Sequence, residues 1–141
     1  MNHKQALYEI IGLNTKLSKL QTQSYELKNI FFDYIEGLHY EYKVSSTYNR
    51  EDFSFKIFGN KLKLKATYND KATSFQGVFS VFVLRVENDK DKLIELLYWE
   101  FDTYGNLKKA DENYVFTSRD FAESFYIELM KKLIDSNKFE L

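Results

Sequence analysis

The chain lacks cysteine and proline altogether, and it has few glycines and histidines. Its 141 residues include 5 Gly and 2 His. The absence of cysteine excludes disulfides and thiolate chemistry. The absence of proline means that no residue forces a helix to kink or stop, so a long helix can run unbroken.

A long apolar run and a strong charge of one sign are also missing. No stretch approaches the roughly 18 consecutive apolar residues of a membrane span, and the first residues have neither the apolar core nor the cleavage site of a secretory signal. With 20 Lys and Arg against 21 Asp and Glu, the formal net charge is −1, so the general basic footprint of a nucleic-acid-binding protein is absent. We therefore expect a cytoplasmic protein that binds neither a membrane nor, as its main partner, nucleic acid.

Aromatic residues are what the chain has in abundance. Phe, Trp and Tyr make up 18% of the residues, with 13 Phe and 11 Tyr. Phenylalanine supplies core area, and tyrosine suits half-buried sites and interfaces because it joins an apolar ring to a polar tip. The overall composition is that of a globular protein, and the length predicts a single domain over residues 1–141.

Residues 4–38 have the apolar spacing of a helix. A stripe that alternates steps of three and four residues consists of Ile10, Leu13, Leu17, Leu20, Ser24, Leu27, Phe31, Tyr34 and Leu38, with Ser24 as its one polar member. One helix of this length would span about 50 Å, against about 30 Å for a strand of eight to ten residues. We expect either two helices that turn near residues 20–24, or one helix that overhangs the sheet and forms a homodimer through Leu13, Leu17, Leu20, Leu27 and Phe31.

An antiparallel meander of four to five strands is expected next. Alternating apolar runs on both sides of Gly59-Asn60 predict a hairpin that turns at these two residues. Residues 75–86 and 93–102 predict two longer strands, and a short strand near 107–109 follows a turn at Gly105-Asn106. In the first long strand both faces are apolar, with Phe79, Val81 and Val83 on one face and Phe82 and Leu84 on the other. Because antiparallel sheets usually expose one face to water, we expect cover for the second face, either from a helix on each side or from a partner chain.

The last segment predicts a second helix. Thr117 and Asp120 are spaced almost as in a capping box, and an apolar helical face follows with Phe121, Phe125, Leu129, Met130, Leu133 and Ile134. The order of a long N-terminal helix in one or two segments, an antiparallel meander and a C-terminal helix predicts an α+β fold.

Motifs for catalysis and metal binding are missing. The sequence has no phosphate-binding glycine loop, no H-E-x-x-H and no nucleophile elbow. His39 has Glu36 and Glu41 nearby, but two neighbouring residue types do not make a metal site. We expect no enzymatic activity, no metal and no cofactor. One alternative is an enzyme or small-ligand-binding protein with a pocket between helix and sheet that uses Glu95, Glu100, Asp102 or His39. A second is a nucleic-acid-binding protein that uses Lys56, Lys61, Lys63 and Lys65.

The last third of the chain is acidic. Residues 93–141 carry six Lys and Arg and ten Asp and Glu, a net charge of −4. Acidic groups steer a basic partner and tyrosines anchor it, so the candidate interface consists of Tyr98, Glu100, Asp102, Tyr104, Asp111, Glu112 and Tyr114. We expect a small non-enzymatic binding or inhibitor protein of bacterial or phage type, such as an immunity, anti-defence or chaperone-like protein, with a basic target such as a nuclease.

Overall fold

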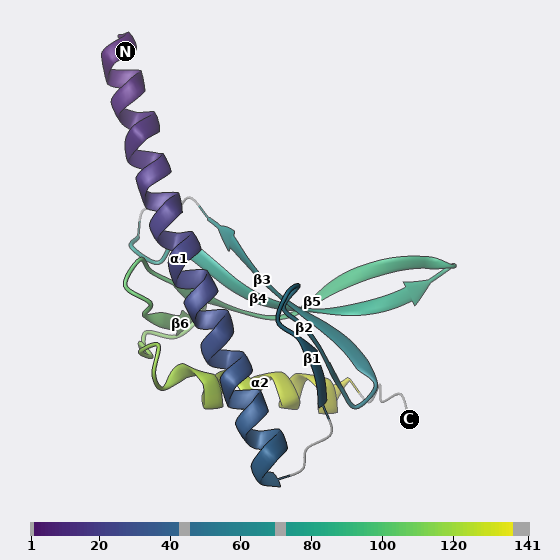
Figure 1. Cartoon of the computed structure of the whole chain (residues 1–141). Coiled ribbons are helices and arrows are strands. Elements are labelled where there is room, and N and C mark those ends of the chain that lie inside the picture. The colour runs from purple at the N-terminus through teal and green to yellow at the C-terminus, as the bar shows by residue number, and fades with distance from the viewer. Residues whose placement is uncertain (1, 43–45, 70–72, 137–141) are drawn as a thin grey trace.

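The protein has an α+β fold with one helix at each end and an antiparallel sheet between them. A computed structural model describes residues 2–42, 46–69 and 73–136. Its elements, drawn in Figure 1, are α1 (His3–Tyr42), β1 (Ser46–Asn49), β2 (Ser54–Ile57), β3 (Asn60–Tyr68), β4 (Gly77–Glu87), β5 (Lys90–Phe101), β6 (Leu107–Lys109) and α2 (Phe121–Asp135). The fold class predicted from the sequence is confirmed.

The sheet is a six-stranded meander in which each strand pairs with its neighbour in sequence. The order is β1-β2-β3-β4-β5-β6 and all pairs are antiparallel. The strand count exceeds the four to five expected because β1 also pairs into the sheet. Its sequence, Ser-Thr-Tyr-Asn, lacks the alternating apolar residues that predict a strand.

The first helix is continuous, which excludes the alternative of two helices that turn near residues 20–24. It has 40 residues and is therefore about 60 Å long. Its first buried residue is Leu20, and residues 3–19, which we call the overhang, contain no buried residue. Figure 1 shows the overhang projecting past the end of the sheet.

Both helices pack on the same face of the sheet. The ring of Phe125 in α2 lies 5.2 Å from that of Phe31 in α1, 5.2 Å from that of Phe79 in β4 and 5.3 Å from that of Trp99 in β5, measured between ring centres. Phe125 thus joins α1, α2 and the sheet in one core. The expectation of one helix on each face is wrong.

The other face of the sheet, which we call the open face, has no helix over it among the described residues. Phe79, Val81 and Val83 are buried as predicted, whereas Phe82 and Leu84 on the open face are half-buried in this chain. Lysine side chains shield part of this face: the ammonium of Lys65 lies 5.3 Å from the centre of the Phe82 ring. Long lysine stems can cover apolar surface while the charge stays in water.

Two details of the strands differ from the prediction. The first hairpin turns at Phe58-Gly59, whose φ angles are 50° and 77°, and Asn60 already pairs with Ile57 as the first residue of β3. Simple alternation along residues 93–102 places Leu93 on the same face as Leu97 and Trp99. A β-bulge at Leu96 reverses this facing for the residues before it, since Val81 pairs with Leu97 but Phe82 pairs with Glu95. Glu95 therefore shares the open face with Tyr98, and Ile94, not Leu93, faces the helices.

The start of α2 also differs in its hydrogen bonds. The helix begins at Phe121, and the hydroxyl of Thr117 donates to the carboxylate of Asp120 (3.0 Å) instead of accepting a backbone N–H as a cap. The carbonyl of Thr117 accepts the N–H of Phe121 (3.2 Å). The boundary of the helix was predictable from the apolar face, but the expected capping box is not formed.

Candidate functional site

Two of the seven interface candidates are buried. Glu100 is 4% exposed and Asp102 is 5% exposed. The expectation that both carboxylates form a solvent-facing acidic surface is therefore wrong. Their roles are structural, and each has partners that explain its burial.

Asp102 organises the turn between β5 and β6. Its carboxylate accepts hydrogen bonds from the backbone N–H of Tyr104 (2.9 Å), the backbone N–H of Asn106 (2.9 Å) and the side-chain amide of Asn106 (3.0 Å). Aspartate is favoured before a turn because it can bind the N–H groups that the turn leaves free. Gly105, with φ of 83°, supplies the left-handed residue of this turn.

Glu100 lies on the open face beside the neighbouring strand. It pairs in register with Lys108, whose ammonium lies 3.6 Å from the Glu100 carboxylate. The same ammonium lies 5.5 Å from the centre of the Phe75 ring. A buried carboxylate needs such a partner, because leaving one charge unpaired costs several kcal/mol.

Three of the other five interface candidates meet at one place, together with Glu95, which was named for the enzyme or small-ligand alternative. Glu95, Tyr98, Asp111 and Glu112 line a hollow of about 310 Å³, together with Leu96, Leu97, Lys109, Ala110, Glu128 and Lys132. We call this site the acidic hollow. It brings residues from β5, from the end of β6 and the segment after it, and from α2 to one surface.

The position of Glu128, on the α2 side of the acidic hollow, is fixed by contacts with Trp99 and Lys109. The indole N–H of Trp99 donates to the Glu128 carboxylate (2.9 Å), and the ammonium of Lys109 lies 3.6 Å from the same carboxylate. Lys109 also lies 4.0 Å from Glu112. Glu128 was not among the candidates, because helical spacing alone does not show which polar residue of α2 will border the sheet edge.

The acidic hollow lies along an unpaired stretch of β5. The three residues of β6 pair with Trp99, Glu100 and Phe101. Over residues 90–98, β4 is the sole strand neighbour of β5 within the described parts of the chain. This free edge offers backbone N–H and C=O groups to a further strand.

The two remaining tyrosine candidates are exposed but do not line the acidic hollow. Tyr104 is 83% exposed in the turn before β6. The ring of Tyr114 is also exposed and packs edge-on against Phe116, with 4.7 Å between the ring centres. The structure therefore divides the predicted interface into a hollow, two buried carboxylates and two outlying tyrosines.

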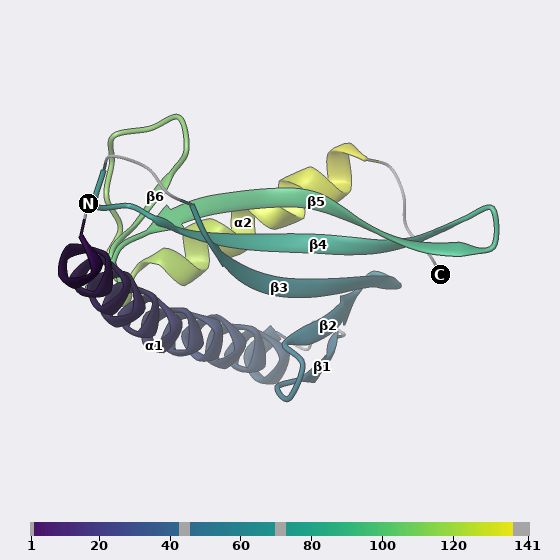
Figure 2. The same ribbon diagram turned by 90° about the horizontal axis from the view of Figure 1, so that it is seen from above.

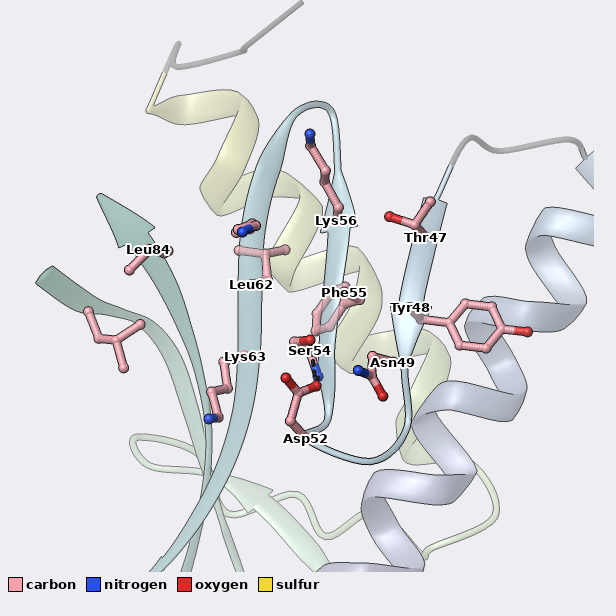
Figure 3. A pocket seen from close by; sticks show the side chains of 12 residues that line it. Thr47, Tyr48, Asn49, Asp52, Ser54, Phe55, Lys56, Leu62, Lys63 and Leu84 are labelled. Atoms are coloured by element: carbon pink, nitrogen blue, oxygen red, sulfur yellow. Dashed lines mark hydrogen bonds between the residues drawn. The ribbon is translucent and has the colours of Figure 1, made fainter. Parts of the chain in front are cut away.

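A second hollow lies on the open face at the opposite side of the sheet. It measures about 410 Å³ and is lined by three lysines, Lys56, Lys61 and Lys63, with Leu84 and Leu93 from the longer strands and polar groups of Thr47, Asn49, Asp52 and Ser54 (Figure 3). We call it the lysine hollow. The hydroxyl of Ser54 donates to Asp52 (2.6 Å), and this hydrogen bond lowers the pKa of the Asp52 carboxyl. Lys65, the fourth lysine named from the sequence, lies outside this lining.

The residues expected to form a homodimer seam fall into two groups. Leu20, Leu27 and Phe31 are buried in the protein's own core, so they cannot form the seam that the sequence suggested. Leu13 is exposed and Leu17 is half-buried. The apolar stripe of α1 thus serves the core in its second half and is uncovered in its first half.

The residues named for an enzyme or ligand pocket do not come together. A hollow of about 240 Å³ does lie between α1 and β3, lined by Leu17, Leu20, Gln21, Ser24, Ala66, Thr67, Tyr68 and Phe101. Glu95, Glu100, Asp102 and His39 are all absent from this lining. Among the described residues, no group of three or more His, Cys, Asp and Glu side chains is placed to hold a metal ion.

Comparison with protein-family models, with curated proteins and with solved structures finds no match for this chain. In residues 2–42, 46–69 and 73–136, no helix combines the length and the apolar character needed to cross a membrane.

Proposed function

We propose that the chain is a small cytoplasmic protein that binds another protein and has no enzymatic activity. Its partner-facing surface is the acidic hollow together with the free edge of β5. The observation that carries this proposal is the position of Glu95, Tyr98 and Asp111 beside strand backbone that β6 leaves unpaired. An immunity, anti-defence or chaperone-like role fits such a surface.

The edge of β5 suits an extended segment of the partner. Strand addition at an exposed edge takes its affinity from backbone hydrogen bonds and its specificity from neighbouring side-chain sites. The partner strand would continue the position of β6, beyond Lys109. Tyr98, at 41% exposed, provides an aromatic contact at this edge.

The charge of the acidic hollow favours a basic partner. Four carboxylates line it, from Glu95, Asp111, Glu112 and Glu128, against two ammonium groups from Lys109 and Lys132, which leaves a net charge of −2. Exposed acidic groups raise the association rate of a basic partner more than they raise its affinity. A nuclease is one class of target with such a surface.

Charge reversal tests this proposal. Glu95→Lys together with Asp111→Lys should keep the fold, because exposed charges contribute little to stability. A partner captured from the source cells with the wild-type chain and identified by mass spectrometry should associate about ten times more slowly with this variant at low salt.

Glu51→Lys is the matched control, since Glu51 is exposed in the turn between β1 and β2, at the opposite edge of the sheet. It should leave the association rate unchanged. Equal rates for the wild type and the double variant at low and high salt would rule out the acidic hollow as the contact surface.

The lysine hollow supports a second candidate function, the binding of single-stranded nucleic acid. Lys56 and Lys61 are directly opposite each other in the register, an arrangement of like charges that destabilises a sheet. Neither forms an ion pair with another described residue. A polyphosphate backbone would relieve this repulsion.

Fluorescence anisotropy with a labelled single-stranded oligonucleotide tests the second candidate. Binding should weaken with salt, and Lys61→Glu should reduce it more than Lys131→Glu, a matched change on the exposed side of α2. Equal binding by the two variants, or no binding at low salt, would remove this candidate.

A further inference from the structure

We propose that the overhang of α1 pairs with the overhang of a second copy of the chain, in antiparallel orientation. This surface is separate from the acidic hollow, so the inference does not depend on the proposed function. Ile10 is 64% exposed, and Leu7, Ile11 and Leu13 are exposed as well. Most of this projecting helix lacks tertiary packing, and its exposed apolar residues need cover.

The spacing of the stripe identifies the seam. Its steps of three and four assign Ile10 and Leu17 to heptad position a, and Leu13 to position d. The half-buried Ala6 occupies the preceding d position. From Ala6 to Leu17 the overhang therefore has an a/d seam that continues, without a break in phase, the stripe that packs in the core.

The length of the overhang fits an antiparallel pair. In such a pair each a residue lies opposite a d residue of the second copy, so Ile10 faces Leu13 and Leu17 faces Ala6. The same register brings His3 opposite Leu20, which is the first buried residue of α1. The paired region thus ends where the sheet begins, and it uses the whole overhang without drawing residues out of the core.

Charges beside the seam favour the same orientation. Glu9 and Lys16 both occupy position g. In the antiparallel register Glu9 lies across from Lys16 of the second copy, and Lys16 lies across from Glu9, which gives two ion pairs per dimer. In a parallel pair Glu9 would instead meet Asn14, and Lys16 would meet Gln21. This charge complementarity favours a second copy of the chain as the partner of the overhang.

Because the chain has no cysteine, single engineered cysteines can test the orientation with no cross-linking at native thiols. Ala6→Cys and Leu17→Cys chains, mixed and treated with a short bis-maleimide, should give a cross-linked dimer. Neither variant alone should cross-link efficiently, since equal residues lie far apart in an antiparallel pair. Cross-linking of Ala6→Cys with itself, or no cross-linking in the mixture, would overturn the proposal.

The mass in solution tests the seam. The full chain should approach twice its 16.9 kDa at high-micromolar concentration in sedimentation equilibrium. Ile10→Glu should weaken the dimer at least tenfold. Tyr8→Glu is the matched control, because Tyr8 is equally exposed at 62% but lies on the opposite side of the helix, and it should leave the mass unchanged.

Charge exchange separates the antiparallel pair from any other contact. Glu9→Lys should weaken the dimer, and so should Lys16→Glu, because each change places like charges opposite each other. The double variant Glu9→Lys/Lys16→Glu should restore the wild-type mass. A monomeric wild type, or a double variant no stronger than the single variants, would overturn the proposal. Circular dichroism checks that each variant keeps its fold.

Discussion

The carboxylate of Asp102 illustrates how much one residue can decide in this protein. It accepts three hydrogen bonds within the turn between β5 and β6, two of them from backbone N–H groups. Hydrogen bonds to a charged group contribute about 1.5–3 kcal/mol each when they are buried. The turn therefore depends on an acidic side chain that, from sequence alone, resembles a surface charge.

Replacing Asp102 with alanine should destabilise the fold. We expect a loss of about 3 kcal/mol in the free energy of unfolding, because the substitution removes the acceptor of three hydrogen bonds in a partly buried turn. Urea denaturation monitored by circular dichroism measures this loss. Asp111→Ala is the matched control and should change the stability by less than about 0.5 kcal/mol, since Asp111 is exposed. Equal stability of the two variants would contradict the structural role of Asp102.

The sequence contained a signal for this role that the acidic composition obscured. Asp102 precedes Gly105-Asn106, and an aspartate at the start of a glycine-containing turn commonly binds its backbone. Glu100 carried no comparable signal. Its burial depends on the pairing of β5 with β6, which places Lys108 beside it, and a sequence pattern does not specify that pairing.

At the scale of elements, the side chains on the two faces of β4 differ in burial: Phe79 is buried and Phe82 is half-buried. Phe79 lies between the sheet and α2, and its ring centre is 5.9 Å from that of Phe121 and 5.2 Å from that of Phe125. Phe82 faces the open side and contacts Lys65. Alternation in the sequence showed that both faces are apolar, but it did not show that both helices pack on one of them.

Substitution of the two phenylalanines measures this difference. Phe79→Ala should cost about 3–5 kcal/mol of unfolding free energy, the usual range for a fully buried phenylalanine. Phe82→Ala should cost about 1–2 kcal/mol, since a half-buried ring removes less apolar area from water. Thermal and urea denaturation of both variants gives the comparison. A loss for Phe82→Ala as large as that for Phe79→Ala would show that the open face is covered in solution.

Regular patterns predicted the elements well, and local irregularities were the source of the errors. The apolar spacing of α2 and the alternation of β3 gave the right element types. The bulge at Leu96 could not be predicted, because an extra residue in one strand is defined by its pairing with another. The turn at Phe58-Gly59 was displaced by one residue because asparagine also tolerates the backbone conformation of such turns.

At the scale of the whole molecule, three surfaces remain uncovered by the described chain: the overhang, the lysine hollow and the acidic hollow with the edge of β5. The overhang was foreseen as one alternative, from the length of the apolar stripe. The free edge was implied by the predicted strand lengths, since a three-residue strand cannot pair with all of its longer neighbour. The meeting of Glu95, Asp111 and Glu128 in one hollow depends on the packing of α2 and lies beyond what the sequence can specify.

Figure 2 shows the tip of the long hairpin of β4 and β5 extending beyond both helices. Residues 90–93, 95 and 98 of β5 are exposed. In the proposed function a partner binds at this edge by adding a strand. Backbone amides that enter a new ladder of hydrogen bonds exchange more slowly with solvent. The distribution of protection along the sheet therefore reports directly where a partner binds.

Amide hydrogen exchange of the chain, alone and with its captured partner, locates the strand that pairs with the edge of β5. We predict slower exchange on binding for the amides of residues 93–98 of β5, with no change at β1 and β2 on the opposite edge of the sheet. Unchanged exchange along β5, with new protection at the lysine hollow or at no part of the sheet, would contradict the claim.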